Sequence, residues 1–147
     1  MRDIRTADGD DLDALRRLET RCFDLDAQSR RSLRHLLTRA NATVRVVDGD
    51  DGLLAGAVLL FRRGTRSARL YSVAVVPEAR GGGLARRLLA DAERLAAARG
   101  CRRLRAEARL GNTASRALFA AAGYRERACL PGYYPGGEAG IRLEKEL

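Results

Sequence analysis

Residues 81–83 are three consecutive glycines, placed between a β-rich segment that ends at Pro77 and a stretch with helical periodicity. Glycine permits a positive φ and lets the backbone come close to a ligand. The first N–H groups of the helix that follows have no internal partner and lie at the positive end of its dipole. These features predict a site for a phosphate or pyrophosphate, to which Arg80 and Arg86 add charge. The alternative is a flexible turn that binds nothing.

The glycine turn departs from two familiar nucleotide-binding patterns. A P-loop requires Gly-Lys-Ser or Gly-Lys-Thr after a spaced glycine, and the chain has neither sequence. A dinucleotide-binding turn requires Gly-x-Gly-x-x-Gly, but Arg86 stands where the last glycine belongs. The order of the elements is also wrong for that fold. The turn therefore indicates an anion site of another kind.

Glu107 is the second residue whose type and place could do chemistry. It lies near the end of the alternating segment 103–108, and a carboxylate there can act as a general base. The alternation places it on the same side of the strand as Arg103, Arg105 and Arg109. A solvated carboxylate in surface salt bridges, which would contribute little to stability, is the alternative interpretation.

Hydrophobic periodicity predicts the elements that position these residues. Strands are expected at residues 4–7, 43–47, 53–61, 68–76, 103–108, 124–130 and 140–147. Helices are expected from the N-cap Asp8 toward Cys22, after the N-cap Ser29, from residue 84 to Gly100, and over residues 113–122. The order βααβββαβαββ predicts an α/β fold with a mixed, mainly antiparallel sheet of about seven strands and four helices. Its clear β-α-β crossover runs through the glycine turn.

The bulk properties indicate one ordinary globular domain. The chain has 147 residues, and we expect residues 1–147 to form a single domain. It is 46% hydrophobic and 32% charged, which excludes a disordered or collagen-like chain. No apolar run approaches the roughly 18 residues of a membrane-spanning helix. No apolar signal segment follows Met1, so we expect a cytoplasmic protein without membrane association.

Charge and cysteines narrow the function classes further. The net charge is +9, carried by arginines that are mixed with acidic residues, and aromatic residues make up only 5%. This scatter argues against direct nucleic-acid binding, although a basic surface still favours acidic partners such as a nucleotide cofactor or a ribosome. The three cysteines, Cys22, Cys101 and Cys129, are spaced too widely for a disulfide framework or a metal site. We expect small buried side chains there, and no metal.

Three segments together resemble a known family. Arg80, Gly83 and Ala85 fill the positions of motif A of the GNAT acetyltransferase superfamily, Arg/Gln-x-x-Gly-x-Gly/Ala. Residues 107–119 with Gly123 and Tyr124 resemble its segment E-x-R-x-x-N-x-x-A-x-x-L-Y … G-[FY]. Residues 133–138 resemble the YY-x-D-G-E-D-A loop of the RimI-like protein N-terminal acetyltransferases, whose members include ribosomal-protein-alanine acetyltransferases. The matches occur in order and span almost the whole chain.

The resemblance implies acetyl-CoA as the cosubstrate and assigns residues to it. Backbone groups of one strand would bind the pantetheine arm, and the N–H of its last residue would polarise the thioester carbonyl. The glycine turn would hold the pyrophosphate, and residues of the next helix would complete the site. The implied cofactor-binding set is Val73, Ala74, Val75, Arg80, Gly81, Gly82, Gly83, Leu84, Ala85, Arg86, Asn112, Ser115 and Phe119.

The resemblance also implies direct transfer of the acetyl group in a ternary complex, with Glu107 as the general base. An α-amine has an ordinary pKa of about 7.7–8.0 against about 10.4 for lysine, so it is more easily presented in the neutral form. The family pattern has Tyr, the general acid, where this chain has Phe119. Either the acid is dispensable, or Tyr134, Tyr133 or water replaces it, or the protein only binds acetyl-CoA. Phe119 can also be plain core packing.

The acceptor is the least determined part of the assignment. In the resemblance, Tyr133 and Tyr134 close over an acceptor peptide opposite the loop around residues 23–28, where Phe23 contributes. An ordinary aromatic turn is the alternative. Ala139 stands where the family loop has Asp. The expected acceptor is the N-terminal α-amine of a protein or peptide, for example a ribosomal protein. A lysine side chain or a small amine is the runner-up, and a monomer or weak homodimer is expected.

Overall fold

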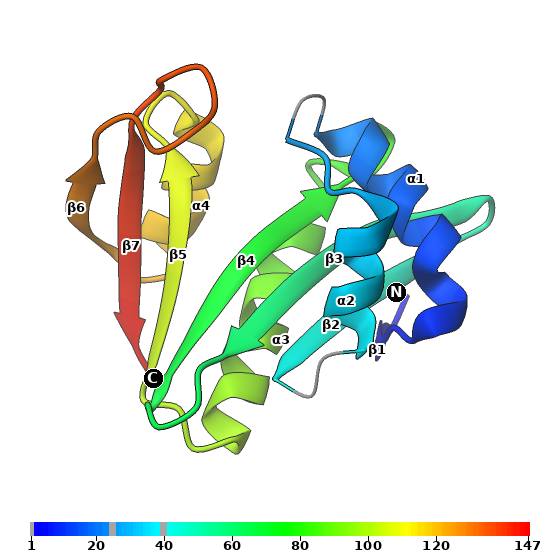
Figure 1. The fold of residues 1–147 in the computed structure, drawn as a ribbon, viewed down its shortest axis with the longest axis horizontal. Coiled ribbons are helices and arrows are strands. Elements are labelled where there is room, and N and C mark those ends of the chain that lie inside the picture. The colour runs from blue at the N-terminus through cyan, green and yellow to red at the C-terminus, as the bar shows by residue number, and fades with distance from the viewer. Residues whose placement is uncertain (1, 24–25, 39–40) are drawn as a thin grey trace.

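The computed structural model describes residues 2–23, 26–38 and 41–147, which build one seven-stranded sheet in the order β1-β2-β3-β4-β5-β7-β6 (Figure 1). The strands are β1 (Ile4–Thr6), β2 (Ala42–Gly49), β3 (Gly52–Phe61), β4 (Ser67–Val75), β5 (Arg103–Arg109), β6 (Arg125–Leu130) and β7 (Gly140–Glu146). The helices are α1 (Leu12–Cys22), α2 (Arg30–Thr38), α3 (Leu84–Ala98) and α4 (Thr113–Ala121). Short 3-10 turns, η1 (Gly9–Asp11) and η2 (Pro77–Ala79), precede α1 and the glycine turn.

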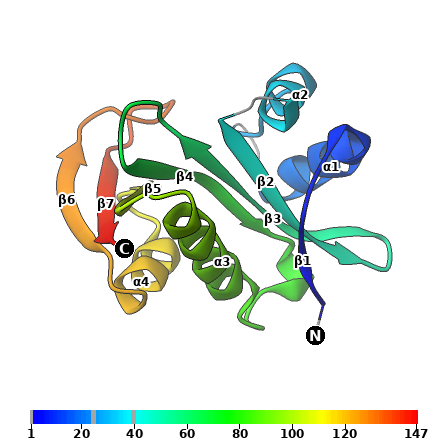
Figure 2. The same ribbon diagram turned by 90° about the horizontal axis from the view of Figure 1, so that it is seen from below.

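The sheet has helices on both faces. Helices α1 and α2 cover one face, and α3 and α4 lie against the other (Figure 2). Each face has its own apolar core. Leu15, Leu18 and Val46 are buried in the core under α1 and α2, whereas Leu59, Leu88 and Leu104 are fully buried in the core under α3. Because apolar side chains alternate along β5, its other face is left to the polar residues Arg103, Arg105, Glu107 and Arg109.

Strands β4 and β5 are the parallel pair of the sheet, and they stay paired over only part of their length. The register runs from Ser67 opposite Arg103 to Leu70 opposite Ala106. Immediately afterwards β4 carries a bulge, because Val58 and Leu59 of β3 face Ser72 and Leu70 and leave Tyr71 as the extra residue. A bulge bends and twists its strand. Beyond it β4 and β5 diverge and open a gap between their carboxyl ends (Figure 1).

The element order and the fold class predicted from the sequence are confirmed. Several boundaries shift by one or two residues, and two of the differences have a visible cause. Asp8 caps the short turn η1 rather than α1, and accepts a hydrogen bond from the Asp10 N–H at 2.9 Å. The turn between the strands expected at 43–47 and 53–61 shortens to Asp50 and Asp51, because β2 and β3 continue to Gly49 and Gly52. Asp24 and Leu25, part of the loop expected after α1, lie outside the described residues.

The expectation of buried cysteines is wrong for Cys129. Cys22 and Cys101 are partly buried, but Cys129 is exposed. It lies on β6, an edge strand, whose residues from Arg125 to Cys129 are all exposed. Among the described residues, no helix is long and apolar enough to cross a membrane.

Candidate active site

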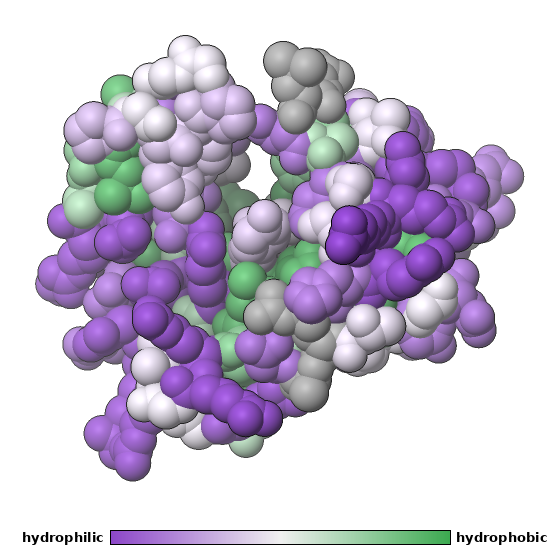
Figure 3. Space-filling model, in the orientation of Figure 1, coloured by the Kyte–Doolittle hydropathy of each residue, from purple (hydrophilic) through white to green (hydrophobic). Residues whose placement is uncertain are grey.

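The gap between β4 and β5 is the place where the predicted site residues meet. The α1–α2 connection stands on one side of its mouth, and the β6–β7 loop stands on the other (Figure 1). The space-filling view shows the molecule hollowed between these two parts (Figure 3). The glycine turn follows the carboxyl end of β4, and Glu107 lies near the carboxyl end of β5. Ligands of α/β sheets bind where adjoining strands part in this way.

The glycine turn has the open geometry that an anion site requires. Gly81 and Gly83 have φ values of 86° and 85°, and a Cβ on either would meet no heavy atom within 4 Å. The space in front of the turn is therefore free of protein. The Arg87 N–H donates to the Gly83 carbonyl at 3.0 Å. The helical ladder starts there, so the N–H groups of Leu84, Ala85 and Arg86 have no intrahelical acceptor.

The inner edge of β4 presents backbone groups to the gap. The Val76 N–H donates to the Leu54 carbonyl of β3 at 2.9 Å. Because successive residues of a strand direct their N–H and C=O groups to opposite sides, those of Val75 and Val73 face away from β3, toward the gap. The Val75 carbonyl accepts a hydrogen bond from Arg80 Nε at 2.9 Å, which is consistent with this orientation. The same alternation turns the groups of Ala74 toward β3.

The side chain of Glu107 is buried beside arginines. It is 7% exposed, so the interpretation as a solvated surface carboxylate is wrong. Arg69 Nε of β4 donates to its Oε2 at 3.0 Å, and Arg142 of β7, which faces Glu107 in the sheet register, has its Nε 3.9 Å from Oε1. The expected placement on one face with Arg103, Arg105 and Arg109 is confirmed. Its role as a base stays a prediction.

The two tyrosines of the β6–β7 loop lie close to this carboxylate. The Tyr133 hydroxyl accepts a hydrogen bond from Arg69 Nη2 at 2.9 Å, so one guanidinium contacts both Glu107 and Tyr133. The rings of Tyr133 and Tyr134 meet edge to face, with centroids 5.0 Å apart. Burial raises the pKa of Tyr134 to about 12, and the charges of Tyr133 and Glu107 act in the same direction. The Tyr134 hydroxyl therefore keeps its proton at neutral pH.

Arg109 fixes the loop across the mouth of the gap. Its guanidinium lies over the Tyr134 ring, 4.4 Å from the centroid, and donates to Glu138 at 3.0 Å. It also bonds Asp26, which belongs to the α1–α2 connection on the opposite side. Glu138 in turn accepts the Gly111 N–H at 3.1 Å, and these bonds hold the pKa of its carboxyl group below the ordinary value. The polar contacts of Arg109 thus connect the two sides of the gap at its mouth.

The remaining predicted residues have clear structural partners. Asn112 caps α4, and its side chain accepts the Ser115 N–H at 3.0 Å. Phe119 is buried in the core against Tyr124, with ring centroids 5.1 Å apart. Phe23 ends α1 and packs partly buried against the core under α1 and α2. Contacts of these four residues with a cofactor or acceptor stay predictions.

Sequence reasoning missed the residues that surround Glu107 and Tyr134. Arg69 of β4 and Arg142 of β7 reach Glu107. Asp26 and Glu138 of two loops bond Arg109, which lies over the Tyr134 ring. The alternation of β4 places Arg69 on one face of that strand. The register that brings this face beside Glu107 has no local signal, because residues 69 and 107 are far apart in the chain.

Comparison with protein families decides the class of this site. The model of the acetyltransferase (GNAT) family matches residues 12–124, which is most of the chain. The chain belongs to the GNAT family. It is therefore an N-acetyltransferase, and acetyl-CoA is the acetyl donor that this family uses. A comparison with curated protein sequences gave no match.

Solved structures agree with this assignment over the full length. The ribosomal-protein-S18-alanine N-acetyltransferase of Escherichia coli has a TM-score of 0.89 and 25% identity, covering 99% of this chain and 94% of that one. The ribosomal-protein-alanine N-acetyltransferase of Brucella melitensis has a TM-score of 0.83 and 27% identity, covering 98% and 99%. The NatC complex bound to Gag peptide and CoA shares the fold, with a TM-score of 0.83, 18% identity, and 99% and 98% coverage.

Proposed function

We propose that this acetyltransferase acts on the N-terminal α-amine of a protein or peptide. The observation that carries the proposal is the pairing of a buried carboxylate, Glu107, with a tyrosine that keeps its proton, Tyr134, at the gap between β4 and β5. A base and an acid side by side are what amine acylation by a thioester requires. The proposal treats residues 1–147 as one catalytic domain, since all seven strands join one sheet.

The residues along the gap fit acetyl-CoA. The free N–H groups at the start of α3 and the open turn at Gly81 and Gly83 would hold its pyrophosphate. The backbone groups of Val73 and Val75 would bind its extended arm, while Ala74 supports the strand through β3. When bound there, acetyl-CoA supplies an activated acetyl carbonyl. The Val75 N–H, aimed into the gap, is placed to bind the oxygen on which charge develops.

The proton transfers follow from the two side chains. Glu107 takes a proton from the attacking amine, directly or through water, as the new N–C bond forms. The Tyr134 hydroxyl gives its proton to the sulfur as the C–S bond breaks, which replaces the acid that Phe119 cannot supply. A thiol with an ordinary pKa of about 8.5 leaves readily, so this second transfer contributes less than the first.

Three considerations favour an α-amine over a lysine side chain. An α-amine is mostly neutral near pH 8, whereas a lysine amine must lose a proton with an ordinary pKa of about 10.4. A carboxylate is a weak base, which suits an amine that is already close to neutral. The two bacterial relatives at 25% and 27% identity act on the alanine of a ribosomal protein. A ribosomal protein is therefore the acceptor to test first.

Replacing Glu107 with Gln tests the base. We expect Glu107→Gln to lower kcat by about 100-fold, the lower end of the range for a general base, and to leave the KM for acetyl-CoA unchanged. The matched control is Glu126→Gln, because Glu126 is an exposed carboxylate paired with Arg116 away from the gap. Turnover is followed as release of free CoA with a peptide that begins with alanine.

The acceptor class is tested with a pair of peptides of one sequence. One has a free N-terminus and no lysine, and the other has a blocked N-terminus and one lysine. We expect turnover with the first only. Turnover with the second only would assign the enzyme to lysine side chains, and wild-type kcat in Glu107→Gln would remove Glu107 as the base.

A further inference from the structure

A groove lined mainly by arginines leads away from Glu107 along the open face of the sheet. It has a volume of about 760 Å³ and lies between the β3–β4 turn, the start of β4 and the face of β5. We call it the arginine groove, after the arginines that line it: Arg62, Arg63, Arg66, Arg69, Arg102, Arg103 and Arg105. Glu144 is the one acidic residue among the described residues that line it. The same face is strongly hydrophilic in Figure 3, over the lower parts of β5 and β7.

The groove is continuous with the candidate active site. Arg69 belongs to its lining and donates directly to Glu107 at 3.0 Å. Arg105, also in the lining, lies two residues before Glu107 on the same face of β5. Two residues of a strand span roughly 7 Å, which is also the span of two residues of an extended peptide. An acceptor whose amine reaches Glu107 therefore places its next residues beside these arginines.

Most of this positive charge is not neutralised within the protein. Arg69 pairs with Glu107, and Arg103 pairs with Glu144 at 3.1 Å. The other groove arginines form no ion pair with any described residue: Arg62, Arg63, Arg66, Arg102 and Arg105.

Two buried guanidinium N–H groups lie near Glu107, one from Arg105 in the lining of the groove and one from Arg142 outside it. Arg105 Nε and Arg142 Nε are both buried without a hydrogen-bond partner among the described residues. Such a group costs stability unless an acceptor reaches it. Arg142 stands opposite Glu107 in the register of β5 and β7, and Arg105 stands opposite Glu144. Carboxylates match guanidinium groups in charge and in geometry, because one carboxylate can accept two parallel N–H bonds.

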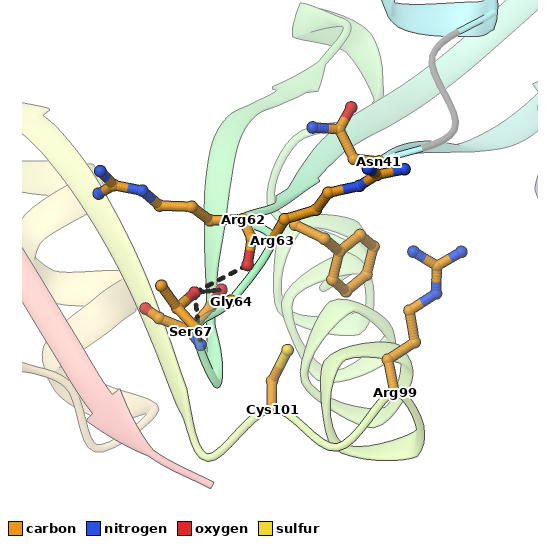
Figure 4. A pocket seen from close by; sticks show the side chains of 9 residues that line it. Asn41, Arg62, Arg63, Gly64, Ser67, Arg99 and Cys101 are labelled. Carbon is orange, nitrogen blue, oxygen red and sulfur yellow. Dashed lines mark hydrogen bonds between the residues drawn. The ribbon is translucent and has the colours of Figure 1, made fainter.

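The outer end of the groove is also basic. There the β3–β4 turn is held by Thr65, whose hydroxyl donates to the Arg62 carbonyl at 2.9 Å. Figure 4 shows Arg62 and Arg63 extending from this turn in opposite directions. The aromatic ring at this end, Phe61, is covered by Arg99, whose guanidinium lies 4.2 Å from the ring centroid. One face of this ring is therefore occupied by a cation rather than left for a nucleic-acid base to stack on it.

We propose that the preferred acceptor is an acidic N-terminus, with Asp or Glu side chains directly after the residue that is acetylated, held by the arginine groove. The inference rests on the proposed function, because only an amine at Glu107 sets the direction in which the chain enters. An acidic peptide combines the amine that the base requires with carboxylates for Arg105, which forms no ion pair with a described residue, and for Arg142, whose Nε has no hydrogen-bond partner among them.

The first test compares three peptides that begin with Ala and differ only at their second and third residues: Asp-Glu, Asn-Gln and Lys-Arg. We expect kcat/KM for the acidic peptide to exceed that of the neutral one by about tenfold, which is the effect of one charge-assisted contact. The basic peptide should have the lowest kcat/KM of the three. The advantage should shrink from 0.05 to 0.5 M salt, since exposed charges are screened.

The second test assigns the preference to the groove. Arg105→Gln should raise the KM for the acidic peptide and leave that for the neutral one unchanged, and Arg105→Glu should reverse the order of the peptides. Arg125→Gln is the matched control, because Arg125 is an exposed strand arginine on β6, outside the groove. A further comparison needs only the wild-type enzyme, which the acetylated acidic peptide should inhibit more strongly than the acetylated neutral one.

The outcomes separate this inference from the function on which it rests. Equal kcat/KM for the acidic and neutral peptides, or a preference for the basic one, overturns the acidic acceptor while leaving N-terminal acetylation standing. A preference that survives Arg105→Glu overturns the role of the groove. Turnover of none of the three peptides contradicts the proposed function itself. Inhibition by an oligonucleotide, without any advantage for the acidic peptide, would assign the groove to nucleic acid.

Discussion

Arg69 is the residue around which the candidate site is organised. Its guanidinium donates to Glu107 and to the Tyr133 hydroxyl, and so connects β4, β5 and the β6–β7 loop. Burial lowers the pKa of Arg69, but Glu107 and the nearby tyrosines outweigh this and raise it above the ordinary value. The charge on Arg69 is therefore permanent, and it lies directly against the Glu107 carboxyl group. A carboxyl base beside a protonated tyrosine is the arrangement on which the proton transfers depend.

Tyr134 gives a testable prediction about a single residue. Its pKa is raised to about 12, so it stays protonated over the pH range in which α-amines become neutral. We expect Tyr134→Phe to lower kcat roughly 10- to 100-fold, at or below the usual range for a general acid, because the thiolate is a good leaving group. Tyr133→Phe should cost less, since the Tyr133 side chain is more exposed and contacts Arg69 rather than the gap.

A pH profile separates an acid from a packing residue. For the wild type, kcat should rise as the amine loses its proton and then stay level to about pH 10, because Tyr134 has not yet ionised. In an optical titration of the folded protein, Tyr134→Phe should have one tyrosine fewer that ionises at high pH than the wild type. A kcat that falls between pH 8 and 10 in the wild type, or an unchanged kcat in Tyr134→Phe, would remove Tyr134 as the acid.

At the scale of elements, the sequence predicted those features that have a local signal in the chain. Leu12, Leu15 and Leu18 recur at helical spacing and are buried in α1, and Gly100 and Gly123 follow the ends of α3 and α4. The glycine turn and Glu107 were found because the residue type and the sequence immediately around each of them are enough to identify it. The gap between β4 and β5 has no such local signal, since it depends on where pairing stops at Leu70 and on the bulge at Tyr71. Pairing between distant strands has no signature within either strand.

The alternation of β4 gives a prediction for individual amides. The Val73 and Val75 N–H groups face the gap, whereas those of Ala74 and Val76 are turned to β3, where Val76 bonds Leu54 at 2.9 Å. Hydrogen exchange without ligand should therefore be fast at Val73 and Val75 and slow at the other two. Saturating acetyl-CoA should slow exchange at Val73 and Val75 by about tenfold or more, as their N–H groups acquire acceptors.

Ala74 and Val76 serve as internal controls for this measurement. They lie on the same strand end, so general stiffening of β4 by the ligand would slow all four amides together. Equal protection of the four amides would contradict the alternation, and no protection at Val75 would remove its N–H from the oxygen-binding role.

For the whole molecule, the feature to explain is how a sheet that opens in its middle stays together. The half formed by β1 to β4 joins the half formed by β5 to β7 through the four residue pairs between β4 and β5. Helix α3 packs behind this junction, and its Glu93 accepts hydrogen bonds from Tyr124 at 2.8 Å and from Lys145 at 3.0 Å in the other half. The sequence predicted α3 from its leucines but not these long-range contacts.

A second polar contact of α3, two residues before Glu93, is a buried ion pair, which carries the last prediction. Asp91 is 8% exposed and accepts from Arg45 Nε of β2 at 2.8 Å and from Arg45 Nη2 at 3.0 Å. Arg45 Nη1 also donates to Thr6 of β1 at 2.8 Å, so three elements meet at one guanidinium. Asp91→Ala leaves that charge buried without a carboxylate, which should lower the free energy of unfolding by about 3–5 kcal/mol.

Such a loss is a large share of the roughly 5–15 kcal/mol that stabilises a small domain. The matched control is Asp13→Ala, which breaks the exposed pair of Asp13 with Arg30, where Asp13 is 66% exposed, and should cost far less than Asp91→Ala. Urea denaturation with an unchanged m value measures both. The double variant Arg45→Met with Asp91→Leu removes both charges together and should recover most of the loss. If Asp91→Ala costs no more than Asp13→Ala, the ion pair does not hold α3 to the sheet, and apolar packing under α3 must do so alone.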